Sequence, residues 1–416
     1  MRKLLIVTGA GASLDFGMPS VKEIDKLFEE WSLNILPLRD DPSKSLYSWV
    51  KEKLLFYVSQ DKSNRLDNII NFENILFLIQ NLYSLSKDRT NGRNNTSLNS
   101  FIDVSEFPVV LSFGKEKKAD CYDFHFLHSS LIDKLLDYFR TKCKTIKGDK
   151  PNELESLKLF FESLKDDFEI GFINLNYDNI LTTILPNLNT GFDKTSGEFS
   201  RDKFYNSEWD FCYHIHGSIH FDMKGGKDST EMHKVLWNDD LTSQFSSNSS
   251  GRSGNYTSEG LDHLNSSIIA GLDKVNQILK EPFGSYYMSL DKLLYESDSI
   301  LFIGYGFNDL HLNKMFPFIR YDNLKTRKVV IIDWANDEED GLNYRHDSWS
   351  FGVFTTLPFN GFELGDGKFR EPHPAIYFKK RHKLEKSSNP KYPIAVWYNG
   401  LLEACKHVDT IKKELL

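Results

Sequence analysis

At 416 residues, with 40% hydrophobic and 26% charged side chains, the chain can form one large α/β domain with insertions or two domains. Its formal net charge of −8 excludes a global basic surface, so we expect no direct contact with nucleic acid. No stretch approaches the roughly 20 apolar residues of a membrane span, and the apolar N-terminal run is too short for a signal peptide. We therefore expect a cytoplasmic protein without membrane contact, and its four scattered cysteines predict neither disulfides nor a cysteine zinc site.

The first expected element is a buried strand followed by a glycine turn, in the stretch LLIVTGAGASLDFGMPS at residues 4–20. Leu4–Val7 form an apolar run without alternation, which is typical of a parallel strand covered on both faces. Gly9 and Gly11 suit a turn that approaches a phosphate, because a Cβ atom would hold the oxygens away from the amides. A dinucleotide-binding fingerprint requires a third glycine where the chain has Leu14, so an ordinary dehydrogenase is disfavoured.

Residues 21–165 predict an inserted helical module, because the helical pattern is too long for a single crossover connection. Apolar residues recur there at three- and four-residue steps, which places them on one face of each helix. The expected helices carry Ile69, Phe72, Ile75, Leu76 and Ile79; Phe124, Leu127, Leu131, Leu135 and Phe139; and, after Pro151, Leu154, Leu157, Phe161 and Leu164. The polar stretch 84–100 is expected to be a surface loop.

Strands return after the module, as short apolar or alternating runs that end in polar residues or glycine. The runs are 168–176, 212–221, 299–307 and 328–334. With helices between them they predict an α/β fold with a doubly wound, Rossmann-like parallel sheet, whose ligands bind at the carboxyl ends of the strands. The expected division is residues 1–20 and 166–335 as the Rossmann-like domain, 21–165 as the helical module and 336–416 as a C-terminal extension.

Two segments fall outside this alternation of strands and helices. The low-complexity stretch 241–260 is expected to be a mobile loop, either a lid over the cleft or a tolerated insertion, because it cannot bury enough apolar surface. In the C-terminal extension we expect a strand near FGVFTT, at 351–356, and a terminal helix from about Pro393.

Candidate functional residues stand at four of the expected strand ends. They are Ser13 in the glycine turn; Asn176 and Asp178 in NLNYDN; His214 and His216 in HIHGS; and Gly304, Gly306, Asn308 and Asp309 in GYGFND. Because the carboxyl ends of parallel strands meet at one edge of a sheet, we expect these residues to surround one cleft.

Other interpretations of the same residues stay open. Asn176 and Asp178 also suit caps of the helix that follows a strand. His214, His216 and His220 also suit a metal site, but no carboxylate stands at a matching spacing, so we expect no metal.

The order of these motifs resembles the sirtuin fold. The matching stretches are GAGASLDFGMP (9–19), NLNYD (174–178), HG (216–217), GYGF (304–307) and VIID (330–333). Protein deacylases of that family also carry two cysteine pairs that hold a zinc module, and this chain has none. Ser20-Val21 and Asn174-Leu175 stand where those enzymes have Phe-Arg and Thr-Gln. The resemblance therefore implies a sirtuin-like fold that binds NAD, without a zinc module, and weakens the case for acyl-peptide binding.

Without that zinc module and with a helical insertion, the chain is most similar to the sirtuin-like NAD hydrolases of bacterial antiphage defence. Residues 270–313 resemble the members encoded beside a HerA-type helicase, which form a large complex and destroy cellular NAD on infection. The resemblance implies NAD as the substrate, a homo-oligomer, and a HerA-type ATPase as partner.

Each candidate residue receives an expected role from this resemblance and from its chemistry. Those expected to bind the dinucleotide are Gly9, Ala10, Gly11 and Ser13 at the diphosphate, Gly304 and Gly306 at the adenosine half, and Asp333 at its ribose hydroxyls. Asn176 is expected to orient the nicotinamide ribose and the attacking water, and His216 to act as general base. Asp178 either joins them or holds the turn.

Three functions follow from these observations and stay open on the sequence alone. The first is NAD hydrolysis to nicotinamide and ADP-ribose, which would deplete NAD in abortive infection. The second is a non-catalytic sensor of NAD or ADP-ribose, and the third is a structural subunit of an ATPase complex.

Overall fold

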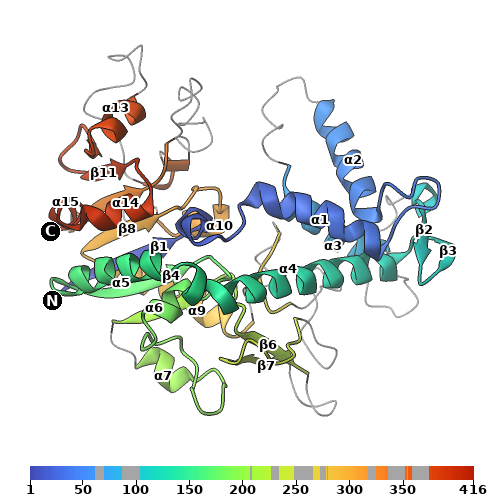
Figure 1. The fold of residues 1–416 in the computed structure, drawn as a ribbon, viewed down its shortest axis with the longest axis horizontal. Helices are drawn as coiled ribbons and strands as arrows, with labels where there is room; N and C mark the ends of the chain where they lie inside the picture. Colours follow the sequence, from blue (N-terminus) through green and yellow to red (C-terminus); the bar gives the residue numbers. More distant parts are fainter. Residues whose placement is uncertain are drawn as a thin grey trace.

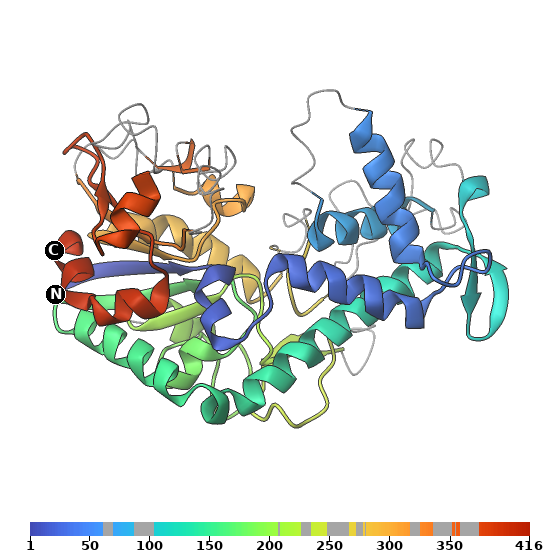
Figure 2. The same ribbon diagram turned by 45° about the horizontal axis from the view of Figure 1, so that its top comes forward.

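The computed structural model describes residues 1–60, 70–86, 104–206, 209–225, 234–247, 266–271, 278, 280–316, 325–335, 352–353, 355–357 and 374–416. Figures 1 and 2 show an α/β lobe that holds both chain ends and a helical lobe beside it. The long helix α4, Cys121–Asp149, begins in the helical lobe and ends beside the α/β lobe, so it belongs to both.

The α/β lobe is built on a seven-stranded sheet in the order β10-β11-β9-β8-β1-β4-β5. The strands are β1 Arg2–Thr8, β4 Phe168–Asn174, β5 Phe211–His214, β8 Ser299–Ile303, β9 Lys328–Ile332, β10 Glu385–Lys386 and β11 Ile394–Trp397. All neighbours pair parallel except β10 and β11. The chain leaves β1 toward β4 and β5, then crosses to β8, so the strand order reverses between β1 and β8. The predicted doubly wound α/β fold is confirmed.

Both faces of the sheet are buried, which explains the continuous apolar run of β1. Leu4 and Ile6 pack into one core, beneath α5 (Pro151–Lys165) and α15 (Val408–Leu415). Leu5 and Val7 pack into the other core, with α9 (Phe283–Glu296). Because successive side chains of a strand point to opposite faces, neither face can be polar here.

The helical lobe contains α1 Val21–Ile35, α2 Leu46–Ser59, α3 Phe72–Ser86 and most of α4, with a hairpin of β2 Val109–Ser112 and β3 Lys115–Lys118. A capping box starts α1: Ser20 Oγ accepts from the Glu23 amide, and the Glu23 carboxylate accepts from the Ser20 amide. Within the described parts of the chain, no helix is both long and apolar enough to cross a membrane.

The three helices expected from the apolar periodicity are present as α3, α4 and α5. Of the residues used to predict the first, Ile69 lies outside the described residues. So does most of the expected loop 84–100, of which residues 84–86 end α3. The last of the three, α5, packs against β4 and therefore covers the sheet.

Several short elements connect the strands and helices. They are the 3-10 turns Ala10–Ala12, Leu14–Phe16 and Val104–Glu106, the helices α6 Ile180–Ile184, α7 Arg201–Tyr205, α10 Leu310–Asn313, α13 Pro374–Lys380 and α14 Leu401–Lys406, and the hairpin of β6 Phe221–Lys224 and β7 Lys234–Trp237. Residues 248–260 of the expected mobile loop lie outside the described residues.

Three sequence predictions are wrong in detail. The run 212–221 is not one strand, because β5 ends at His214 and Gly217, with φ +96°, turns the chain toward β6. The described residues among 351–356 are helical rather than extended. No helix starts at Pro393: the buried run Ile394–Trp397 pairs with β9, and the helix begins only after Gly400.

Candidate functional site

The expected strand ends meet at one edge of the sheet. The pairing register aligns Thr8, the last residue of β1, with Asn174 of β4 on one side and Ile303 of β8 on the other. Asn174 in turn aligns with His214 of β5. The turns that follow these strands therefore emerge side by side where the strand order reverses, the usual ligand edge of a doubly wound sheet.

The glycine turn is pressed against the end of β8. The Gly9 amide donates to Ile303 O at 2.9 Å and the Gly11 amide to Gly304 O at 3.0 Å. A Cβ atom on Gly9 would lie 2.7 Å from Gly304 O, so the glycines permit this close approach of two backbones. These two amides are already used inside the protein, so a diphosphate site at the turn stays a prediction and requires other donors.

Ser13, Asn176 and Asp178 form one hydrogen-bonded cluster. Ser13 Oγ donates to Asp178 Oδ2 at 2.6 Å and accepts from Asn176 Nδ2 at 2.9 Å. The same Nδ2 donates to Gly9 O at 2.9 Å. Both amide protons of Asn176 are thus held by the glycine turn, and these bonds leave its Oδ1 to act on a ligand.

Asp178 is almost fully buried, and its second oxygen accepts from the Ile180 amide at 3.0 Å. Burial raises the pKa of this carboxyl above its ordinary value, against the hydrogen bonds from Ser13 and Ile180. Of the two roles left open by the sequence, these contacts favour the one in which Asp178 holds the turn.

Asn174 and Thr8 support this cluster and were not among the expected site residues. Asn174 Oδ1 accepts from Thr8 Oγ1 at 2.8 Å and from the Asn176 amide at 3.0 Å, and its Nδ2 lies 3.3 Å from His214 Nδ1. Both are buried polar residues at the last register position of their strands. The sequence did contain a signal for these two residues, since each is a polar residue at the end of an apolar run expected to be a parallel strand.

His216 is paired with a carboxylate from another strand end. Its Nε2 lies 2.8 Å from Asp309 Oδ2, and both side chains are buried. Asp309 is itself fixed, because its Oδ1 accepts from the His311 and Leu312 amides at 3.0 Å each at the start of α10. With the Nε2 proton donated to Asp309, Nδ1 of His216 is the nitrogen that can accept a proton.

The buried hydroxyl group of Tyr287 is influenced by the charge of Asp309, the partner of His216. Tyr287 Oη of α9 has no hydrogen-bond partner within the described residues. Burial and then the charges of Asp309 and Tyr177 raise the pKa of Tyr287. Because buried polar atoms are nearly always paired, a hydroxyl of this kind suits a polar group of a ligand. Nothing in the sequence singles out Tyr287, since aromatic residues on a helix face usually belong to the core.

Two expected site residues lie further along this edge. Asp333 follows β9, two strands from β1, where its amide donates to Trp397 O at 2.9 Å and its Oδ1 accepts from the Trp334 amide at 2.8 Å. Gly306 follows β8, and a Cβ atom there would lie 3.3 Å from Asn308 Nδ2. Their roles at the adenosine half stay predictions.

A small cavity lies behind the cluster. It is lined by Ser13, Asn174, Asn176, Asp178 and Leu401 among others, and its volume is about 20 Å³. That volume holds a single water molecule, and the polar lining supplies partners for one. The cavity therefore has room for one water molecule and is too small for a dinucleotide.

The alternative metal site at His214, His216 and His220 is not supported. His214 lies against Asn174 and Cys212, and the Nδ1 proton of His220 is donated to Asn238 O at 2.9 Å. In the described part of the chain, the three imidazoles are not a group whose ligand atoms lie within 4.8 Å of one another.

The burial of His214 predicts a loss of stability in acid. Burial lowers the pKa of His214 to about 3, so the folded state favours the neutral ring. The unfolded chain then binds more protons as the pH falls from about 6.5 toward 3, and the free energy of unfolding decreases across that window. Urea unfolding of wild type and His214→Gln at several pH values should give a shallower pH dependence for the variant. Parallel dependences would contradict this assignment.

Comparison with known proteins agrees with this architecture. No curated protein matches the chain. Domains related to sirtuins bind NAD and are often NAD-dependent enzymes. The expected site residues that lie within the range 171–351 include Asn176, His216, Gly304 and Asp333. The fold brings the glycine turn that follows β1 beside this range. Residues 171–351 match the family model described as a SIR2-like domain, so this part of the chain is sirtuin-like.

Proposed function

We propose that this protein is an NAD⁺ hydrolase that cleaves the N-glycosidic bond of NAD⁺ and releases nicotinamide and ADP-ribose. The observation that carries the proposal is the pair of preorganised polar groups at one sheet edge: Asn176 fixed by Ser13 and Gly9, and His216 fixed by Asp309. The match of residues 171–351 to a SIR2-like domain supports NAD as the bound molecule.

Cleavage of this bond does not require a strong general acid from the protein. NAD⁺ supplies neutral nicotinamide as leaving group, so the residues have to orient the ribose and deliver water. Asn176 can accept a hydrogen bond from a ribose hydroxyl or a water through Oδ1, because its amide protons are already held. His216 Nδ1 can take the proton of the attacking water, while Asp309 stabilises the imidazolium that forms.

The cellular role that we propose is depletion of NAD in antiphage defence. Its support is the resemblance of residues 270–313 to proteins encoded beside a HerA-type helicase. From the same resemblance we infer a homo-oligomer that assembles with a HerA-type ATPase.

The second candidate function is a sensor that binds NAD or ADP-ribose without turnover. The observation in its favour is that the amides of Gly9 and Gly11 are used within the protein. The glycine turn would need a rearrangement before these amides could hold a diphosphate for turnover.

The deciding experiment measures nicotinamide release from NAD⁺ by the purified protein, alone and with a co-expressed HerA-type ATPase. Asn176→Ala should lower the rate about a hundredfold, the cost of removing one preorganised polar group at a reacting centre. Asn81→Ala is the matched control, because the Asn81 side chain donates to Phe77 O within α3, in the helical lobe. Release that Asn176→Ala lacks and Asn81→Ala keeps supports hydrolysis. Tight NAD binding without release in any condition supports the sensor.

A further inference from the structure

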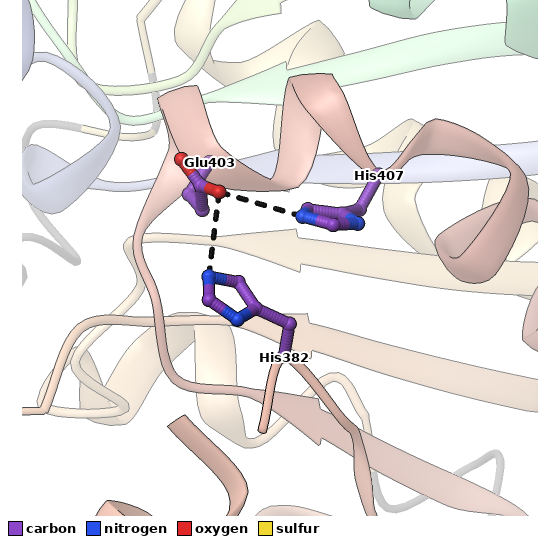
Figure 3. Close-up of side chains that lie close together, drawn as sticks. All are labelled: His382, Glu403 and His407. Atoms are coloured by element: carbon purple, nitrogen blue, oxygen red, sulfur yellow. Dashed lines mark ion pairs between the residues drawn. The ribbon is translucent and has the colours of Figure 1, made fainter. Parts of the chain in front are cut away.

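Three potential metal ligands that are not among the expected site residues converge in the C-terminal part of the α/β lobe. His382 follows α13, Glu403 lies in α14, and His407 stands between α14 and α15. One ligand atom of each lies within 4.8 Å of those of the other two. Figure 3 shows both imidazoles turned toward the same carboxylate oxygen.

The distances fit ligands of one ion. Glu403 Oε1 lies 3.4 Å from His382 Nε2 and 3.4 Å from His407 Nε2. Zinc bonds to nitrogen and oxygen are about 2.0–2.1 Å, so neighbouring ligands of a tetrahedral zinc ion are about 3.4 Å apart. The two separations from Glu403 Oε1 match that edge of a tetrahedron, and the two histidine ligand atoms lie within 4.8 Å of each other.

The two oxygens of Glu403 have separate partners. Lys406 Nζ donates to Oε2 at 2.7 Å, which leaves Oε1 for the imidazoles. A neutral imidazole and a carboxylate are the forms in which these residues bind a metal.

The chain around the cluster holds both histidines in place. His382 has φ +50°, a left-handed conformation that non-glycine residues adopt infrequently, and its amide donates to Lys379 O at 3.1 Å. The His407 amide donates to Ala404 O at 3.0 Å. The buried ring of Trp397 lies behind both imidazoles, with centroids 6.2 and 5.3 Å away.

Solvent reaches the cluster, so an ion can enter it. The side chains of His382, His407 and Glu403 are 45%, 36% and 28% exposed. Three protein ligands leave one position of a tetrahedral ion for water. A two-histidine, one-carboxylate set with an open position suits a divalent transition metal, and imidazole favours zinc, copper, iron or nickel over calcium or magnesium.

We propose that His382, Glu403 and His407 form a mononuclear site for a divalent transition metal, with Zn²⁺ as the ion that fits best. The ion joins the turn after α13 to the junction of α14 and α15. The opposite side of α14 faces the interior, where Leu401 lines the small cavity beside Ser13 and Asn176. Metal binding therefore stabilises the C-terminal helices that support the candidate site.

The test uses the untagged full-length chain, because a histidine tag would itself bind zinc. After chelator treatment, the protein is titrated with ZnCl₂, and the bound zinc is counted by elemental analysis. The wild type should bind one equivalent, and Glu403→Gln should weaken the affinity of this site about a hundredfold or more. Glu414→Gln is the matched control, since Glu414 likewise accepts from a lysine, Lys386, and pairs with no histidine among the described residues.

Thermal unfolding provides a second test, which distinguishes a metal site from a surface ion pair of Glu403 with the two histidines. Zinc should raise the Tm of the wild type and of Glu414→Gln but not that of Glu403→Gln or His382→Ala, because an ion that binds only the folded state stabilises it. The proposal is overturned if the wild type takes up no zinc, or if Glu403→Gln binds it as tightly. Uptake without a rise in Tm would overturn the stabilising role of the ion. None of these readouts depends on NAD turnover.

Discussion

Replacing His216 with alanine is expected to lower nicotinamide release about a thousandfold, the typical contribution of a positioned general base. The reason is geometric: the buried pair of His216 Nε2 and Asp309 Oδ2, 2.8 Å apart, holds the ring in place, and in our proposal Nδ1 takes the proton from water. The variant should fold like wild type and still bind NAD. Wild-type release by His216→Ala would show that another group activates the water.

Asp309→Asn separates the general base from the residue that positions it. The remaining oxygen can still accept from the His311 and Leu312 amides, so the start of α10 should be kept. The new NH₂ group would face His216 Nε2 as a donor and favour the tautomer with the proton on Nδ1. We expect a loss of about a hundredfold in kcat and a changed pH profile, with little change in KM. A merely structural role for Asp309 would leave the pH profile unchanged.

Gly304→Ala is expected to destabilise the protein by about 3–5 kcal/mol. A Cβ atom at this position would lie 2.2 Å from Ala12 N and 2.3 Å from Gly11 C. Both atoms are backbone of the glycine turn, so no side chain can move aside, and the φ of +58° disfavours any L-residue. The measurement is the free energy of unfolding in urea, by far-ultraviolet circular dichroism.

Gly148→Ala is the matched control for this effect. Gly148 lies in α4, and a Cβ atom there would meet nothing within 4 Å. Alanine should raise stability by about 0.5–1 kcal/mol, because glycine is the weaker helix former. If Gly304→Ala were as stable as this control, the close packing of the glycine turn against β8 would not be a constraint on the fold.

The sequence predicted the central strands because their signals are local. A run such as Leu4–Val7 is apolar on both faces, and only a sheet covered on both sides accommodates that pattern. Ile394–Trp397 was missed because Pro393 suits a helix start, whereas the partner that makes this run a strand is β9, far along the chain. Pairing between distant segments overrode the local signal.

The candidate site was predictable in place but not in detail. The strand ends bearing Asn176 and His216 could be found, since parallel strands share one edge. The partnership of His216 with Asp309 could not, because it joins residues of two separate turns. Gly9 and Gly11 show a different limit: close approach to a phosphate and close approach to another backbone both require glycine, so composition alone cannot distinguish them.

The position of β1 has a consequence for how the chain is made. Strand β1 is synthesised long before its two neighbours in the sheet, β8 and β4, which begin only at Ser299 and Phe168. Helices α1 to α4 lie closer together in sequence and can pack earlier, as local contacts form faster than distant ones. During synthesis this apolar strand therefore stays unpaired while the helical lobe forms, so we expect chaperone binding to concentrate on these few residues.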